Sequence, residues 1–271
     1  MATLRRASAG PGIAALFASR AARAETLRAD PSRDAEPLAL AAVLLRAQGR
    51  AAEEIEAIHG ERPLSGDLAL DLEAISATLH RFLATLRREG PAALATLAES
   101  RASDDARTMA SRLLVYWNGE REVAEDFLSR ALLRPYVETL RASGVAPRRA
   151  RARGRCPACG GGAGVGRRRS EESQGAVRSL FCALCGFEWA IARIRCPACF
   201  EHAPGKLPSF TSPSHPTARI EACETCRRYV KTLDTTFDER ALPEVDDLAS
   251  LALDLWAREQ GFERIEPGVA G

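Results

Sequence analysis

The sequence has no long apolar run and no complete export signal. Its longest apolar stretch, residues 38–45, has eight residues, whereas a membrane-spanning helix needs roughly 18 to 20. A shorter apolar stretch follows Arg5 and Arg6, but Arg20 and Arg23 interrupt what should follow a signal core. These features predict a cytoplasmic protein with no membrane insertion.

Lysine is almost absent as well. All but two of the 38 basic residues are Arg, and the formal net charge is only +2. Arg clusters such as 148–153 and 167–169 are therefore weak evidence for nucleic-acid binding, and no aromatic side chains are interleaved with them. We expect these arginines to be solvated or to contact a protein partner.

Common catalytic motifs are also missing. The chain contains no Ser-His-Asp set, Walker loop or dinucleotide-binding fingerprint. With 271 residues and 46% hydrophobic composition, it is long enough for one large or two ordinary folded domains. The sequence predicts a folded protein that is not an enzyme.

The first 150 residues lack cysteine and have helical periodicity. Apolar residues from Leu68 to Leu86 recur at steps of three and four, which places them on one face of a helix. Turn signals such as Gly90-Pro91 and Asn118-Gly119 separate the segments. A bundle of about six helices is predicted, with helical stretches at residues 12–29, 37–48, 68–90, 91–99, 104–117 and 120–142.

The second half has a different pattern. Residues 145–155 are rich in Pro, Gly and Arg, as in a domain linker. Short segments rich in β-branched and aromatic residues follow, at 177–181, 187–194 and 229–233, and predict strands. One last helix is predicted from Pro243 to Gly261. The expected division is a helical domain at 1–150, metal ribbons at 151–194 and 195–238, and a C-terminal helix and tail at 239–271.

All eight cysteines lie in this half, in four C-x-x-C pairs. The sequence Arg-Cys-Pro-Ala-Cys occurs at 155–159 and again 40 residues later, and the other two pairs are offset by 41 residues. Two copies of one small unit are therefore predicted. The pairs are Cys156/Cys159, Cys182/Cys185, Cys196/Cys199 and Cys223/Cys226.

Two C-x-x-C turns separated by 22 or 23 residues can supply four thiolates to one tetrahedral ion. Disulfides are disfavoured without an export signal. A thioredoxin-like pair needs a single C-x-x-C in a βαβ unit, and iron-sulfur proteins have other cysteine spacings. The sequence predicts two ions, iron or zinc, one in each four-cysteine site.

Pairing within each repeat is the simplest arrangement, with a cross-braced arrangement as the alternative. The within-repeat sets are Cys156, Cys159, Cys182 and Cys185, then Cys196, Cys199, Cys223 and Cys226. Gly160 and Gly186 follow the second cysteine of their turns, where a rubredoxin-like knuckle needs positive φ. Phe200 and Arg227 stand at the corresponding positions of the second unit, which predicts a strained knuckle or a different turn there.

Four thiolates around a divalent ion leave a formal charge of about −2. Nearby cations should compensate for it. The arginines beside the knuckles, Arg153, Arg155, Arg193 and Arg195, are the expected candidates.

The motifs of residues 155–262 resemble the formate dehydrogenase accessory protein family, FdhE. The resemblance rests on both Cys-Pro-Ala-Cys knuckles, on Cys182-Ala-Leu-Cys185 with Glu188-Trp189, on Cys223-Glu-Thr-Cys226, and on Tyr229-Val-Lys231 and 246–251. The helical half matches only in length, helical character and scattered residues. The Arg at 227, where the family pattern has Gly, is a departure from it.

This resemblance implies an α+β architecture with an N-terminal all-helical bundle, two tandem rubredoxin-like metal ribbons and a C-terminal helix. It also implies a cytoplasmic accessory protein or chaperone, not an enzyme, for respiratory formate dehydrogenase. Its expected partner is the molybdopterin-containing catalytic subunit, bound before export. A zinc-ribbon nucleic-acid binder and a rubredoxin-type electron carrier are the alternatives.

Asp246 and Asp247 belong to the motif 246–251 that resembles the family, and they lie near the start of the last predicted helix. They are candidate partner-binding residues. Acidic residues in a first helical turn are also favoured by the helix dipole, and this structural explanation is the preferred one.

Overall fold

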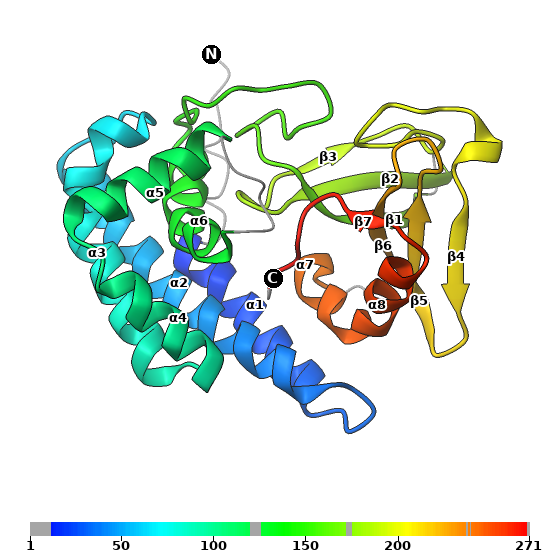
Figure 1. The fold of residues 1–271 in the computed structure, drawn as a ribbon, viewed down its shortest axis with the longest axis horizontal. Helices are drawn as coiled ribbons and strands as arrows, with labels where there is room; N and C mark the ends of the chain where they lie inside the picture. The colour runs from blue at the N-terminus through cyan, green and yellow to red at the C-terminus, as the bar shows by residue number, and fades with distance from the viewer. Residues whose placement is uncertain (1–11, 120–125, 172–174, 237, 239, 270–271) are drawn as a thin grey trace, which may run out of the picture.

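The computed structural model describes residues 12–119, 126–171, 175–236, 238 and 240–269. The helices that precede the first strand lie to the left in Figure 1 and the sheet lies to the right, with the C-terminal helices beside it, which confirms the expected order of a helical part followed by the cysteine-containing sheet. The helices before the first strand are α1 (Ile13–Arg28), α2 (Ala35–Glu61), α3 (Leu68–Glu89), α4 (Ala92–Ala102), α5 (Ala106–Asn118) and α6 (Phe127–Ala142).

Aspartate side chains fix where four of these helices begin. Asp34, Asp67, Asp105 and Asp126 each accept a hydrogen bond from a backbone amide of the first turn, at 2.7–3.2 Å. Such a cap satisfies one of the amides that has no partner within the helix. The start of the helix predicted at 120–142 lies partly outside the described residues, as does the Arg5-Arg6 region.

Helix α2 is 27 residues long, so the predicted end at Gln48 was wrong. The reason is Gly49, which allows α1 to approach: a Cβ at Gly49 would lie 3.2 Å from the Cβ of Phe17. Both Phe17 and Gly49 are buried. This glycine therefore serves helix packing and does not end the helix.

The two cysteine units form one sheet. Its order is β3-β2-β1-β6-β5-β4, with β7 paired to β6. Strands β1 and β6 run parallel and join the units, and Gly166 lies opposite Thr232. A Cβ at Gly166 would overlap the Thr232 hydroxyl, so glycine permits this contact. The strands are β1 (Ala163–Glu171), β2 (Gly175–Cys182), β3 (Glu188–Ala190), β4 (Ser209–Ser212), β5 (His215–Ala222), β6 (Arg228–Asp234) and β7 (Glu263–Arg264).

The C-terminal helical segment is present but interrupted. It consists of α7 (Pro243–Asp246), a 3₁₀ turn (Asp247–Ser250) and α8 (Leu251–Glu259). Lys231 of β6 donates hydrogen bonds to the carbonyl oxygens of Asp247 and Ser250, at 2.8 and 3.2 Å. The C-terminal helix predicted from the sequence is confirmed, and it is interrupted where a buried lysine from the sheet binds its backbone.

The segment predicted as a linker is held by the bundle. The amide of Arg148 donates to the carbonyl of Gly66 at 2.7 Å, and Arg149 lies 5.1 Å from the ring centroid of Trp117. Arg148 thus contacts the loop before α3, and Arg149 contacts the last turn of α5. The domain boundaries stay a prediction. Among the described helices, none is long and apolar enough to cross a membrane.

Candidate metal centre

All four C-x-x-C turns have the same backbone geometry. The amide of each leading cysteine donates to the carbonyl five residues further on, at 2.7–2.9 Å. The carbonyl of that cysteine accepts from the amide four residues on, at 2.8–3.1 Å. The leading cysteines are Cys156, Cys182, Cys196 and Cys223. Their turns are closed hairpins that direct two thiols to one side.

The structure brings the eight thiols into two groups of four, one within each repeat. In each group the four sulfur atoms lie within 4.8 Å of one another. The sets are Cys156, Cys159, Cys182 and Cys185, and Cys196, Cys199, Cys223 and Cys226. The cross-braced alternative does not occur.

The sulfur spacing fits a tetrahedral metal ion. With metal–sulfur bonds of about 2.3 Å, the edges of a tetrahedron are about 3.8 Å. Between facing cysteines of the two turns, the S···S separations are 3.6 and 3.5 Å in the first group and 3.7 and 3.6 Å in the second. Each cluster can therefore hold one metal ion, with every tetrahedral position filled by a cysteine.

The first cluster is part of the hydrophobic core of the bundle. All four of its cysteines are buried, at most 1% exposed, and they pack in one cluster with residues of the bundle helices. Burial raises the pKa of the Cys182 thiol, so thiolates at this position need a compensating cation. A divalent ion supplies that charge and keeps the four sulfurs together.

Amides and arginines surround this first cluster. The amides of Gly161 and Leu184 donate to the sulfurs of Cys159 and Cys182, both at 3.4 Å. Bonds of this kind stabilise a bound thiolate. From the bundle side, Arg141 of α6 donates to the Cys185 carbonyl at 3.2 Å.

Of the four arginines expected to compensate the thiolates, two have other contacts, while Arg193 and Arg195 line the same cavity as Cys196 and Cys223. Arg155 pairs with Glu266, and the Arg153 guanidinium lies 4.2 Å from the centroid of the Phe200 ring. Arg149, expected to be solvated or in a partner contact, instead donates to the Cys159 carbonyl at 3.3 Å. Neither Arg149 nor Arg141 was predicted near the site. Only the folded chain brings their guanidinium groups to the cysteines, and the spacing of residues along the sequence does not show it.

A buried ion network behind the first cluster was also missed. Glu138 of α6 is fully buried and pairs with Arg20 of α1 at 2.8 Å and Arg134 at 2.7 Å. Burial opposes ionisation of Glu138, but the two guanidiniums hold its pKa below the usual value. A Cβ at Gly186 would lie 2.7 Å from the Arg20 guanidinium. The second knuckle of the first cluster thus lies directly against this network.

The second cluster keeps the same turns without the glycines. Gly160 and Gly186 have φ of 75° and 62°, and the matching Phe200 and Arg227 have φ of 68° and 57°. Of the two outcomes expected from the sequence, the strained knuckle is correct. Arg227 is held in this conformation by its guanidinium, which lies 3.9 Å from the Phe262 ring centroid and donates to Gln260.

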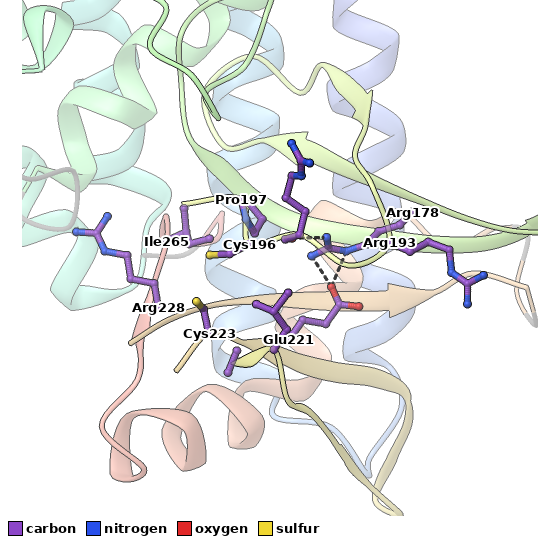
Figure 2. Close-up of a pocket in the computed structure, with 11 residues that line it drawn as sticks. Arg178, Arg193, Cys196, Pro197, Glu221, Cys223, Arg228 and Ile265 are labelled. Atoms are coloured by element: carbon purple, nitrogen blue, oxygen red, sulfur yellow. Dashed lines mark hydrogen bonds and ion pairs between the residues drawn. The ribbon is translucent and has the colours of Figure 1, made fainter. Parts of the chain in front are cut away.

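Burial differs between the two clusters. In the second, Cys196 and Cys223 are buried, Cys226 is partly exposed and Cys199 is exposed. A cavity of about 30 Å³ borders the buried pair, and an ion pair between Arg178 and Glu221 crosses its lining (Figure 2). This cavity has room for only one or two water molecules.

The two aspartates singled out as partner-binding candidates make internal contacts. Asp246 accepts from Nε of Arg23 on α1 at 2.9 Å. Asp247 is 1% exposed and accepts from Arg264 at 2.8 Å. Their contact with a partner stays a prediction, and the structure gives both carboxylates a role within the chain.

Comparisons with known proteins point to one family. Residues 194–269 match the family described as "FdhE, C-terminal domain". A "Protein FdhE homolog" from Aquifex aeolicus is 34% identical over 116 residues, which are 43% of this chain and 41% of that protein. One from Pseudomonas putida is 36% identical over 127 residues, 42% of this chain and 37% of that protein.

The aligned stretch therefore spans about two fifths of these curated relatives. The likeness in structure extends much further. The crystal structure of the FdhE protein from Pseudomonas aeruginosa matches with a TM-score of 0.69 and 28% identity, over 95% of both chains. The helical half, which carried little sequence resemblance, thus has the same fold.

Proposed function

We propose that this FdhE-like chain is an accessory protein for the formation of active formate dehydrogenase. It binds the molybdopterin-containing catalytic subunit in the cytoplasm, before that subunit is exported. The observation that carries the proposal is the likeness to an FdhE crystal structure over 95% of both chains. A likeness of that extent includes the helical half, which a simple zinc ribbon or an electron carrier does not need.

The proposed activity is to hold the catalytic subunit, called the client below, and not to catalyse a reaction. Each cluster offers four cysteine ligands to one ion, and a closed four-thiolate site leaves no coordination position for a substrate. The eight cysteines are accordingly proposed as structural metal ligands. Iron and zinc both suit four thiolates, and the metal is one of these two.

The metal clusters support this role by fixing the shape of the molecule. The first joins the sheet to the bundle, since its cysteines belong to the main hydrophobic core and Arg141 of α6 donates to the Cys185 carbonyl. The C-terminal segment is tied to α1 through Arg23 and Asp246. A client surface built across bundle and sheet would therefore depend on the first ion.

Deletion and complementation in the native host test the proposal. Deleting the gene should abolish respiratory formate dehydrogenase activity, and the intact gene should restore it. Cys182→Ser, which removes a buried ligand, should fail to restore activity. Arg46→Ala, which removes one exposed ion pair with Glu25, is the matched control and should restore it. Full formate dehydrogenase activity in the deletion strain would refute the assembly role.

A further inference from the structure

The two four-cysteine clusters have the same turns but different surroundings. The second cysteine of each turn lies on the outer side of its knuckle, and in the first cluster these residues are Cys159 and Cys185. Both are buried, and α6 and the segment after it cover their carbonyls through Arg141 and Arg149. The bundle therefore closes the first cluster.

Among the residues that the structure describes, no bundle helix covers the equivalent cysteines of the second cluster. Cys199 is exposed and Cys226 partly exposed. None of the described hydrophobic clusters includes a cysteine of this set, whereas the four cysteines of the first set all belong to the main core. Solvent and small solutes can therefore reach Cys199 without unfolding of the core.

The backbone of the second cluster is also less relaxed. Phe200 and Arg227 adopt positive φ, a conformation that is strained in residues other than glycine. Backbone amides donate to cysteine sulfurs in both clusters, so the two clusters differ in core burial and in backbone strain. Rearrangement of the knuckle beside Cys199 relieves strain, while rearrangement in the first cluster breaks core packing.

We infer that the second cluster exchanges its metal ion with small thiols through Cys199, whereas the first holds its ion as part of the fold. An incoming thiol forms one metal–sulfur bond as the Cys199–metal bond breaks. The proton of the incoming thiol passes to the Cys199 sulfur, and no electron is transferred. The same exchange follows at Cys226, the next most exposed ligand, and then at Cys196 and Cys223. Each step uses one incoming thiol and returns its proton to the departing cysteine, so the ion leaves only when all four bonds have been replaced.

Kinetics of zinc transfer from the intact, fully loaded chain test the inference. The zinc is captured by the chromophore 4-(2-pyridylazo)resorcinol at fixed concentration while glutathione is varied. One equivalent should leave at least tenfold faster than the other, at a rate that rises with glutathione. S-methylglutathione, which has no free thiol, should leave the rate unchanged. Equal rates for both ions, or a fast rate independent of glutathione, would overturn the inference.

Alkylation assigns the fast ion to its cluster without any substitution. N-ethylmaleimide added during the fast phase should label Cys199 and Cys226, identified by mass spectrometry, and leave Cys159 and Cys185 unlabelled. Cys199→Ser should bind a single slow equivalent. Labelling of Cys159 in the fast phase, or a fast phase that persists in Cys199→Ser, would contradict the proposed route.

Discussion

The Nζ atom of Lys231 lies 3.2 Å from Oδ1 of Asp247, and the two side chains are 0% and 1% exposed. The pair joins strand β6 to the 3₁₀ turn between α7 and α8. Arg264 and Asp254 complete the cluster. One of only two lysines in the chain is thus wholly enclosed and fixes the C-terminal segment on the sheet.

Replacing Lys231 by Met should strongly destabilise the protein. The change leaves Asp247 and Asp254 without one of their two cations, and breaking a buried ion pair costs about 3–5 kcal/mol. The free energy of unfolding in guanidinium chloride, at constant zinc, measures the effect. Arg46→Ala removes an exposed pair with Glu25 and should change stability by less than about 1 kcal/mol. Equal effects of the two substitutions would refute the structural role of Lys231.

Sequence patterns predicted the parts of the fold that depend on local spacing. The period of three and four in α3 and the four C-x-x-C turns are of this kind, since neighbouring residues specify them. The parallel pairing of β1 with β6 was not predictable, because no local signal links strands some 60 residues apart. The interruption of the last helix depends on Lys231, which reaches it only in the folded chain.

Gly160→Ala should weaken the first metal site. Gly160 has φ of 75°, and an added Cβ would overlap the carbonyl oxygen of Ala150. The strain of positive φ alone is about 1–2 kcal/mol, so zinc affinity should fall at least tenfold in a chelator competition. Gly205→Ala is the control, because nothing lies within 4 Å of its added Cβ. An unchanged affinity in Gly160→Ala would mean that this turn tolerates a side chain.

Asp126 should give a pH-dependent contribution to stability. Burial alone would raise its pKa, but hydrogen bonds from Ser129 and the ion pair with Arg101 hold the pKa below the usual value. Because the folded pKa is depressed, the stabilisation is present above the unfolded pKa of about 3.9 and is lost as pH falls below it.

The difference in unfolding free energy between the native chain and Asp126→Asn should therefore be largest near pH 7 and shrink below pH of about 4. Urea unfolding of both proteins at each pH measures it, and metal loss at low pH is common to both. A difference that stays constant with pH would show that the Asp126 charge contributes nothing.

Loss of a ligand should affect the two clusters unequally. Cys182 is 0% exposed and packs in the bundle core, so Cys182→Ser should lower the thermal midpoint of the helical signal. Cys226→Ser, in the partly exposed cluster, should lose one zinc and leave that midpoint nearly unchanged. Circular dichroism at 222 nm with zinc quantification compares them. Equal loss of helical stability in both variants would mean that the second cluster also supports the bundle.

The candidate site shows the same limit of sequence reasoning as the fold. Spacing identified all eight cysteines and their grouping by repeat, because each knuckle is a local motif. It could not show that α6 covers one cluster and leaves the other open, since Arg141 and Cys185 meet only through packing. The internal role of Asp247 was hidden for the same reason, because its partners come from β6 and β7.

Anaerobic purification of the tagged chain from its own host tests the assembly role most directly. Mass spectrometry should find a formate dehydrogenase catalytic chain in near-stoichiometric amount at moderate salt, and the Cys182→Ser variant should lose it. Recovery of the chain with nucleic acid and without any such subunit would contradict the proposed function.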